Sequence, residues 1–166
     1  MLTEIKSQKG FFTETDALLA KKFSEAGFGF EETGKIFFHP LEAAYLVKIG
    51  KTKFEKFETA EKFATSQKKS DKLFPFAFAA YFQIRQTGRL IRPYLQHTNF
   101  FRAYAPGVGR EKERPSQLVC LLPGKFPSAK SLAEQVKVAH LARLDLIIAC
   151  GTESEIKFYK ISSFNW

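Results

Sequence analysis

The chain has 166 residues, which is long enough for one medium-sized domain or two small ones with a buried core. Its apolar content of 45% excludes a disordered chain, and no apolar run approaches the roughly 20 residues that span a bilayer. The formal net charge of +9 favours a polyanionic partner such as nucleic acid, or an acidic protein surface, although a solvated lysine-rich surface gives the same balance.

The first helical pattern covers residues 14–26, where apolar side chains recur at the spacing of one helix face. Thr13 or Thr15 is the predicted N-terminal cap, and Gly27 is the predicted stop. The residues assigned to the apolar face are Leu18, Leu19, Phe23 and Ala26.

A strand is predicted over residues 35–38, and a well-marked helix follows it. Pro40 fits the first turn of that helix, where the missing backbone N–H is not needed, and Gly50 ends it. His39 precedes the helix and is interpreted as a boundary residue, not as a metal ligand.

A third helix is predicted over residues 54–69, with Phe54 and Phe57 on its apolar side and many charges opposite. The pattern ends in a polar, charged stretch at residues 66–71, which is typical of a link between domains. We therefore expect a small N-terminal helical α/β domain over residues 1–70.

The second half, residues 71–166, is expected to form a domain with a mixed central sheet flanked by helices. It opens with a largely apolar helix over residues 72–87, and another helix is predicted over residues 129–142. Strands are predicted over residues 89–94, 99–105, 117–122, 145–150 and 156–161. Because one helix lies between strands, the chain can cross back to the same sheet, and the predicted fold class is α+β or α/β.

The cysteine and histidine residues give no sign of a metal site. Cys120 and Cys150 lie in apolar, strand-like runs, which is typical of buried free thiols in a cytosolic protein. His39, His97 and His140 are far apart and lack zinc-ligand spacing. The first ten residues contain acidic and polar side chains, which argues against a signal peptide. We therefore expect a cytoplasmic protein with no metal or other cofactor.

Tyr104 is the first candidate for chemistry. Residues 99–109 are predicted to form a strand that delivers this tyrosine to a Gly/Pro-rich loop. A tyrosine in that position of a basic protein is a candidate general base or RNA contact. Half-buried packing is the commoner role of a strand tyrosine, so the pattern alone leaves both interpretations open.

Five segments, in order along the chain, resemble motifs of the archaeal tRNA-splicing endonucleases. Residues 38–51, FHPLEAAYLVKIGK, resemble a family segment with Glu-Ala-x-Tyr-Leu and a closing Gly-Lys. Residues 81–93, YFQIRQTGRLIRP, resemble Tyr-x-x-Leu-Arg-x-x-Gly, and residues 101–104, FRAY, resemble Phe-x-Val-Tyr. Residues 115–119, PSQLV, fall where the family has His-Ser and an apolar strand. Residues 137–144, KVAHLARL, resemble Arg-x-Ala-His-Ser-Val-Arg-Lys.

The resemblance implies an RNA cleavage that uses no metal. In the family, the ribose 2′-hydroxyl attacks the adjacent phosphate and leaves a 2′,3′-cyclic phosphate. The reaction needs a base, an acid and a stabilising cation, which the family supplies as Tyr, His and Lys. Here Tyr104 is at the tyrosine position, but Pro115 replaces the histidine and Leu144 replaces the lysine. We therefore expect a non-catalytic structural subunit that pairs with a catalytic subunit in a heterotetramer acting on precursor tRNA.

Two C-terminal features are predicted to bind the partner. The family inserts an acidic loop into a basic groove of the opposing subunit, and Glu153 with Glu155 stand at that place in this lysine-rich chain. An ordinary polar hairpin turn is the alternative. The last strand carries Phe158, Tyr159 and Ile161, and it could pair edge to edge with a partner or simply close its own sheet.

RNA contacts are predicted at Lys137 and Arg143, near the rim of the helix over residues 129–142. Lys137 matches a family arginine that helps to hold the substrate bulge, although lysine cannot stack or form a two-pronged contact as arginine does. The residues assigned to the inner side of this helix are Leu132, Val136, Ala139 and His140.

Two other functions stay open at this stage. The chain could be an active endonuclease in which Tyr104 works with another acid, such as His97 or His140. It could also be a general RNA-binding scaffold, which would explain the positive charge but not the ordered motifs.

Overall fold

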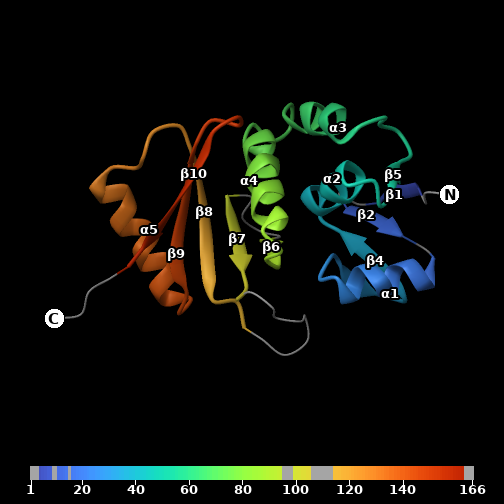
Figure 1. Cartoon of the computed structure of the whole chain (residues 1–166), viewed down its shortest axis with the longest axis horizontal. Helices are drawn as coiled ribbons and strands as arrows, with labels where there is room; N and C mark the ends of the chain where they lie inside the picture. Colours follow the sequence, from blue (N-terminus) through green and yellow to red (C-terminus); the bar gives the residue numbers. More distant parts are fainter. Residues whose placement is uncertain (1–3, 9–10, 15, 95–98, 106–113, 163–166) are drawn as a thin grey trace. The chain divides into compact units, whose positions relative to one another are not determined.

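The structure is a computed structural model that describes residues 4–8, 11–14, 16–94, 99–105 and 114–162 (Figure 1). Contacts within the chain divide it into two compact units, with the boundary between Phe78 and Ala79. This boundary lies inside helix α4 (Phe74–Gln86). The expected division after residue 70 lies before α4, and the division into domains of residues 1–70 and 71–166 stays a prediction.

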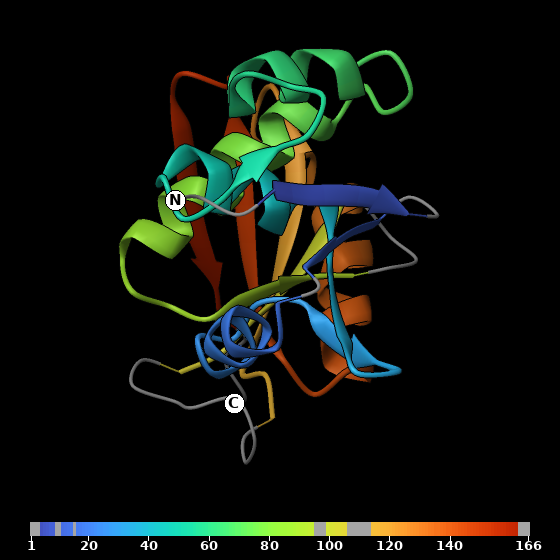
Figure 2. The ribbon, with the colours of Figure 1, turned by 90° about the vertical axis from the view of Figure 1, so that its right-hand side faces the viewer.

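Unit 1 contains a five-stranded sheet with the order β3-β4-β2-β1-β5. The strands are β1 (Glu4–Gln8), β2 (Phe11–Glu14), β3 (Phe30–Glu32), β4 (Lys35–Phe38) and β5 (Lys53–Phe54). The helices are α1 (Ala17–Glu25), α2 (Pro40–Lys48) and α3 (Ala60–Gln67), and Figures 1 and 2 place α1 below and α3 above the strands. Phenylalanines fill the space between them, and Phe12, Phe38 and Phe63 are among those buried.

Helix α1 begins later than predicted, because the residues before it belong to the sheet. Strand β2 pairs with β1 and β4, so Thr13 is a buried strand residue and cannot cap the helix. Asp16 caps α1 instead, and its carboxylate accepts hydrogen bonds from the amides of Leu18 and Leu19 at 2.9 and 3.0 Å. The assignment of Leu18 to the buried face is wrong, since its side chain is 65% exposed.

The helix predicted over residues 54–69 is wrong in its first part. Phe54 lies in β5, which pairs in parallel with β1, and its ring is 4.5 Å from that of Phe63. The helix starts at Ala60, where the hydroxyl of Thr59 accepts from the amide of Lys62 at 3.2 Å. A buried strand pairing therefore overrides the helical spacing of the phenylalanines.

His39 caps helix α2, which confirms its interpretation as a boundary residue. Its Nδ1 accepts from the amide of Leu41 at 3.2 Å, while its own amide donates to the Glu42 carboxylate at 2.9 Å. This reciprocal pair is a capping box in which an imidazole takes the usual place of a hydroxyl. Burial lowers the pKa of His39 to about 4, which keeps the imidazole neutral and able to accept.

This cap predicts an acid-sensitive unit 1. Because the folded pKa of His39 lies below its value in the unfolded chain, the stabilisation is complete above about pH 6.5 and is lost as the pH falls toward 4. We expect the free energy of unfolding in urea to fall by about 2 kcal/mol between pH 7 and pH 5 from this residue alone. His39→Asn keeps a capping acceptor and should remove that pH dependence, whereas His140→Asn at an exposed position should keep it. Equal pH dependence in all three proteins would contradict the prediction.

Unit 2 contains the predicted mixed sheet, with the order β10-β9-β8-β7-β6. Its strands are β6 (Ile91–Pro93), β7 (Phe100–Ala103), β8 (Gln117–Pro123), β9 (Asp145–Gly151) and β10 (Ile156–Ile161). Strands β8 and β9 run parallel and are joined through helix α5 (Ala129–Leu141), whereas the other neighbours are antiparallel. The α+β fold class and these strand positions are confirmed.

The two faces of the unit 2 sheet have different coverings. On one face, α5 packs through Ala139 against Leu118 and Ile148. On the other face, Tyr81 of α4 meets Phe101 edge-on, with 5.9 Å between ring centroids. Cys120 and Cys150 are free thiols buried in the α5 side, as predicted, and burial raises the pKa of Cys120 to about 12. The Cys120 thiol is therefore an inert core group.

Candidate functional site

The three positions that the family resemblance assigns to catalytic groups lie at one end of the unit 2 sheet. Tyr104 follows β7, Pro115 precedes β8 and Leu144 precedes β9. Three backbone hydrogen bonds, each 3.0 Å long, join these ends: Tyr104 N to Leu90 O, Ser116 N to Ala103 O and Asp145 N to Ser116 O. We refer to Tyr104, Pro115 and Leu144 as the degenerate site.

The degenerate site holds one group that can exchange a proton. The Tyr104 side chain is half-buried and offers a phenol. Pro115 is half-buried and has no side-chain donor, and Leu144 packs against the core cluster under α5. Beyond the phenol, these three positions supply neither a second proton-exchanging group nor a cation.

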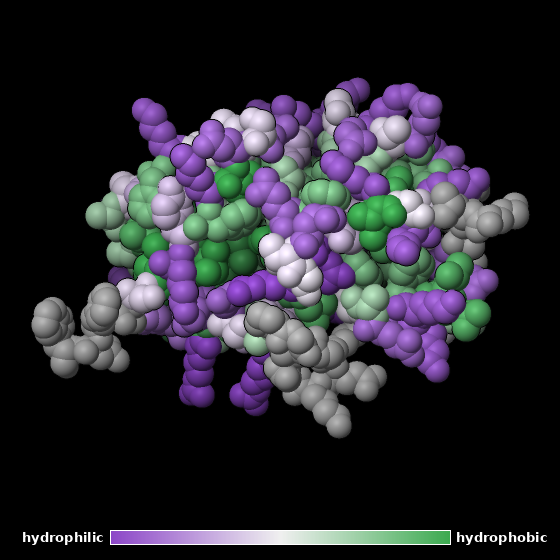
Figure 3. Space-filling view, viewed as in Figure 1, coloured by the Kyte–Doolittle hydropathy of each residue, from purple (hydrophilic) through white to green (hydrophobic). Residues whose placement is uncertain are grey.

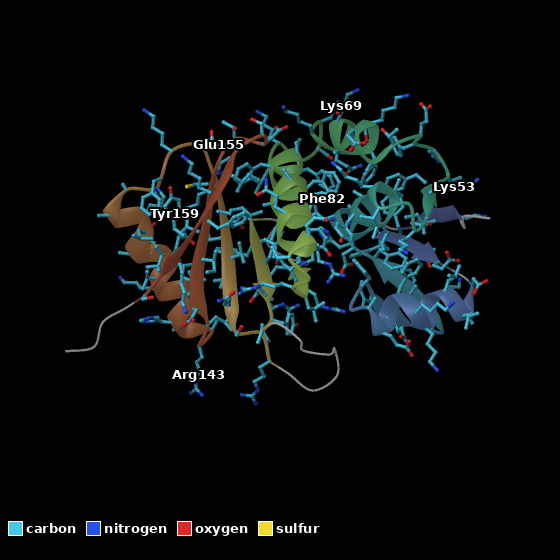
Figure 4. The ribbon with its side chains drawn as sticks, in the orientation of Figure 1. Lys53, Lys69, Phe82, Arg143, Glu155 and Tyr159 are labelled. Atoms are coloured by element: carbon cyan, nitrogen blue, oxygen red, sulfur yellow. The ribbon has the colours of Figure 1, made fainter. Side chains whose placement is uncertain are left out.

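Arg143 does not replace the missing lysine side chain at position 144. It follows the last turn of α5 in the left-handed conformation, with φ of 57°, and the amide of Leu144 bonds back to Ala139 O at 3.0 Å. This turn directs Leu144 into the core and leaves Arg143 exposed, and Figure 4 shows Arg143 projecting from this end of unit 2. Lys137 is exposed on α5, so both residues stay predicted RNA contacts.

The assignment of His140 to the inner side of α5 is wrong, because its side chain is exposed. The inner side is formed by Leu132, Val136 and Ala139, which follow one another at spacings of four and three residues. His97 lies outside the described residues. Within the described ranges, no three His, Cys, Asp or Glu side chains gather in a way that could hold a metal ion. No helix in the described part of the chain is long and apolar enough to cross a membrane.

The predicted acidic loop is a tight hairpin at the opposite end of the same sheet, and we call residues 151–155 the acidic hairpin. Thr152 N donates to Glu155 O at 3.0 Å, and Glu155 N donates to Thr152 O at 3.2 Å. The side chains of Glu153 and Glu155 are exposed, and Glu155 is 3.2 Å from Lys157 Nζ. Figure 4 shows Glu155 and Arg143 at opposite ends of unit 2, and the seven residues of β9 separate the acidic hairpin from the degenerate site by roughly 20 Å.

Gly151 fixes the shape of the acidic hairpin, which gives a stability prediction. Its φ is 121°, and a Cβ at this position would fall on the Glu155 carbonyl oxygen, well inside van der Waals contact. Gly124 has φ of 98° with open space around its Cβ position, and its amide donates to Gly151 O at 2.7 Å. Gly151→Ala should therefore destabilise unit 2 by about 1–3 kcal/mol more than the matched Gly124→Ala, measured by thermal unfolding. Equal losses would mean that the hairpin tolerates the extra methyl group.

Strand β10 is an edge strand whose side chains divide between the two faces of the sheet. Phe158 and Tyr159 are consecutive and have similar exposed fractions, 38% and 40%. The Tyr159 ring packs against Phe126 with 5.0 Å between centroids, and Ile161 packs against the core on the α5 side. Phe158 points to the other face. Of the three β10 residues predicted to bind a partner, Phe158 alone lines the groove described next.

A shallow groove of about 550 Å³ crosses the α4 side of the sheet. Its apolar floor includes Val119, Ile147 and Phe158, and Ile84 of α4 forms one wall. Figure 3 shows apolar surface over the strands of unit 2. Arg89 at the margin is held by a 3.0 Å hydrogen bond to Gln117. The sequence did not predict this groove, because its lining comes from α4 and several separate strands.

The class of protein follows from these features and from comparison with known proteins. No family model matches the chain. The chain is similar to the tRNA-splicing endonuclease of Thermococcus onnurineus, with 28% identity over 156 residues that cover 90% of this chain and 89% of the relative. It is also similar to the enzymes of that name from Thermococcus gammatolerans and Thermococcus kodakarensis, with 28% and 27% identity over 162 residues that cover 95% of this chain and 94% of each relative. These matches run through both units, and the chain is similar to proteins named tRNA-splicing endonuclease over nearly its whole length.

Proposed function

We propose that this chain is the structural, non-catalytic subunit of a tRNA-splicing endonuclease that excises introns from precursor tRNA. The name of the relatives supports tRNA intron excision as the process. The observation that carries the non-catalytic role is the degenerate site, where Pro115 and Leu144 stand beside Tyr104 in place of an acid and a cation.

The chemistry of the reaction explains why these two replacements matter. Attack of the 2′-hydroxyl on the phosphate needs a proton donor for the leaving oxygen and a positive charge near the crowded phosphate. Losing general acid catalysis typically costs about 10²- to 10⁴-fold in rate. Losing a transition-state-stabilising donor costs about 10²- to 10³-fold more. A tyrosine that could accept the first proton does not compensate for either loss.

We assign partner binding to the acidic hairpin, at the end of the unit 2 sheet opposite the degenerate site, and to the edge strand β10. In this proposal, the acidic hairpin enters a basic groove of a catalytic subunit within a heterotetramer. The β10 edge and the neighbouring apolar groove supply backbone hydrogen bonds and buried area. The acidic hairpin lies at the opposite end of the sheet from the degenerate site, so its docking does not require a working site in this chain.

Reconstitution tests the proposal. The purified chain is incubated with an intron-containing precursor tRNA, first alone and then with a paralogous subunit that retains Tyr, His and Lys. We expect no cleavage by the chain alone and accurate cleavage by the mixture. Cleavage by the chain alone would overturn the proposal and favour the alternative of an active endonuclease.

A further inference from the structure

Two arginines face each other on the first two strands of the unit 2 sheet. Arg92 of β6 and Arg102 of β7 are direct partners in the antiparallel register. Side chains in such a pair stand on the same face of the sheet, with Cβ atoms about 5 Å apart. Like charges placed opposite each other repel, so an anion that binds both would be stabilised there. We call Arg92 and Arg102 the arginine pair.

Arg102 is held in a fixed orientation with one donor unused. Its guanidinium carbon lies 4.8 Å from the centre of the Tyr94 ring, and Tyr94 meets Phe100 edge-on at 6.5 Å. The Nε of Arg102 is buried, and no acceptor for it exists among the residues that the structure describes. An unsatisfied buried donor costs about 1–3 kcal/mol, more for a charged group, so Arg102 occupies this position at a cost in stability.

The arginine pair lies beyond the area that α5 covers. Helix α5 packs on β8 and β9, and Figure 1 shows it on the β9 and β10 side of the sheet. The opposite face of β7 carries Phe101, which is fully buried under α4. The arginine pair, Tyr94 and Phe100 are all half-buried, so each presents part of its surface.

Sequence and position together point to RNA as the anion. Every arginine of the chain lies between Arg85 and Arg143, and residues 1–84 use only lysine as a basic side chain apart from His39. Arginine, unlike lysine, can bind phosphate with two donors and stack its flat face on a base. Residues two apart along an extended chain point to the same face and lie about 7 Å apart, which is the spacing of Arg102 and Tyr104 of the degenerate site.

We propose that the arginine pair binds the phosphate backbone of a single-stranded RNA segment beside the degenerate site. The identity of the ligand as RNA rests on the proposed function. A single strand fits better than a duplex, because a sheet face that combines aromatic rings and arginines can stack unpaired bases. The pair thereby retains substrate at a position where this chain performs no chemistry.

The salt dependence of binding tests this inference directly. The probe is a fluorescein-labelled single-stranded uridine RNA of about 12 nucleotides, and anisotropy gives the affinity of the full chain at several salt concentrations. Arg92→Gln with Arg102→Gln should lower the affinity at low salt about 10- to 100-fold and reduce the slope of log K against log salt by about 1.4, at about 0.7 for each lost phosphate contact. The matched control, Lys125→Gln with Lys130→Gln, removes the same charge from exposed positions in unit 2 and should leave the slope close to that of the wild type.

A conservative variant separates charge from geometry. Arg102→Lys keeps the charge, so the salt slope should be retained while the affinity falls several-fold through loss of the fork and the stacked plane. Thermal unfolding checks that each variant is folded. Absence of RNA binding by the wild type, equal losses in the arginine and lysine double variants, or equal affinity for a duplex RNA of the same length would each overturn the inference.

Assembly with a catalytic subunit distinguishes this inference from the proposed function. Size exclusion should show that the arginine double variant still forms the complex, because the pair lies away from β10. If the RNA binding depends on the arginine pair but no complex forms with a catalytic subunit, the inference stands and the proposed function fails. If the complex forms and the arginine double variant binds the probe like the wild type, the inference fails and the proposed function stands.

Discussion

Reversing the charge of the acidic hairpin, with Glu153→Lys and Glu155→Lys, is expected to abolish co-purification with the catalytic subunit. Loss of a desolvated interfacial charge pair costs about 2–5 kcal/mol, so reversal of two charges should weaken the complex at least ~100-fold. The chain itself should stay folded. Both side chains of the ion pair between Glu155 and Lys157 are exposed, and such pairs contribute about 0–1 kcal/mol to the free energy of unfolding.

A control with the same change in net charge separates the effect of the hairpin from the effect of the protein's overall charge. Glu31→Lys with Glu32→Lys alters two exposed acids of β3 in unit 1 and raises the net charge equally. Size exclusion and a titration of labelled chain with the catalytic subunit measure both double variants. An intact complex with the hairpin variant, or equal weakening by the control, would rule out the acidic hairpin as a docking element.

Replacing Phe158 by Asp is expected to have the second large effect. Phe158 lies at the edge of the apolar groove, and a carboxylate there would have to lose its water when a partner covers the groove. Tyr159 has nearly the same exposed fraction but packs on Phe126 of its own chain. Phe158→Asp should therefore weaken the complex at least ~10-fold more than Tyr159→Asp.

Both variants are measured for thermal unfolding before binding, because Tyr159→Asp also removes a ring contact within the chain. The same titration with the catalytic subunit then gives the two affinities. Stronger weakening by Tyr159→Asp would place the interface on the α5 side of β10. If neither variant weakened the complex, both faces of the edge strand would be excluded from the interface with the catalytic subunit.

The sheet of unit 2 could be predicted from the sequence because its strands are strongly patterned. LVCLL within β8 and LIIAC within β9 are apolar runs that follow a polar residue and end at Pro123 and Gly151, as expected for parallel strands covered on both faces. Helices α4 and α5 carried clear start and stop residues, such as Gly88 after α4, whose φ is 77°.

Unit 1 was harder to predict, because its short strands carry a helix-like spacing of phenylalanines. Strands β1 and β2 fall in the first 14 residues and were not predicted, since neither has a long alternating pattern. Phe54 could belong to a helix or a strand by spacing, and its parallel pairing with Ile5 decided the outcome. Such pairings depend on residues far away in the sequence, which local patterns do not contain.

The candidate site, like the fold, could be predicted from the sequence only in part. The sequence identified the positions of the degenerate site through the family motifs, and the parallel pairing of β8 with β9 explains why Pro115 and Leu144 lie at one end of the sheet. The apolar groove and the arginine pair depend on which strands become neighbours. The confinement of arginine to the second half of the chain was the one sequence signal that could have drawn attention to Arg102.

The central claim is that this chain contributes no catalytic group to the complex. Its most direct test is single-turnover cleavage of precursor tRNA by an assembly of this chain with a catalytic subunit whose active-site histidine has been replaced by alanine. The proposed function predicts a rate reduced by at least ~10²-fold relative to the assembly with the intact catalytic subunit. Cleavage within a few-fold of the intact assembly's rate would show that this chain supplies an acid of its own, and would contradict the structural-subunit role.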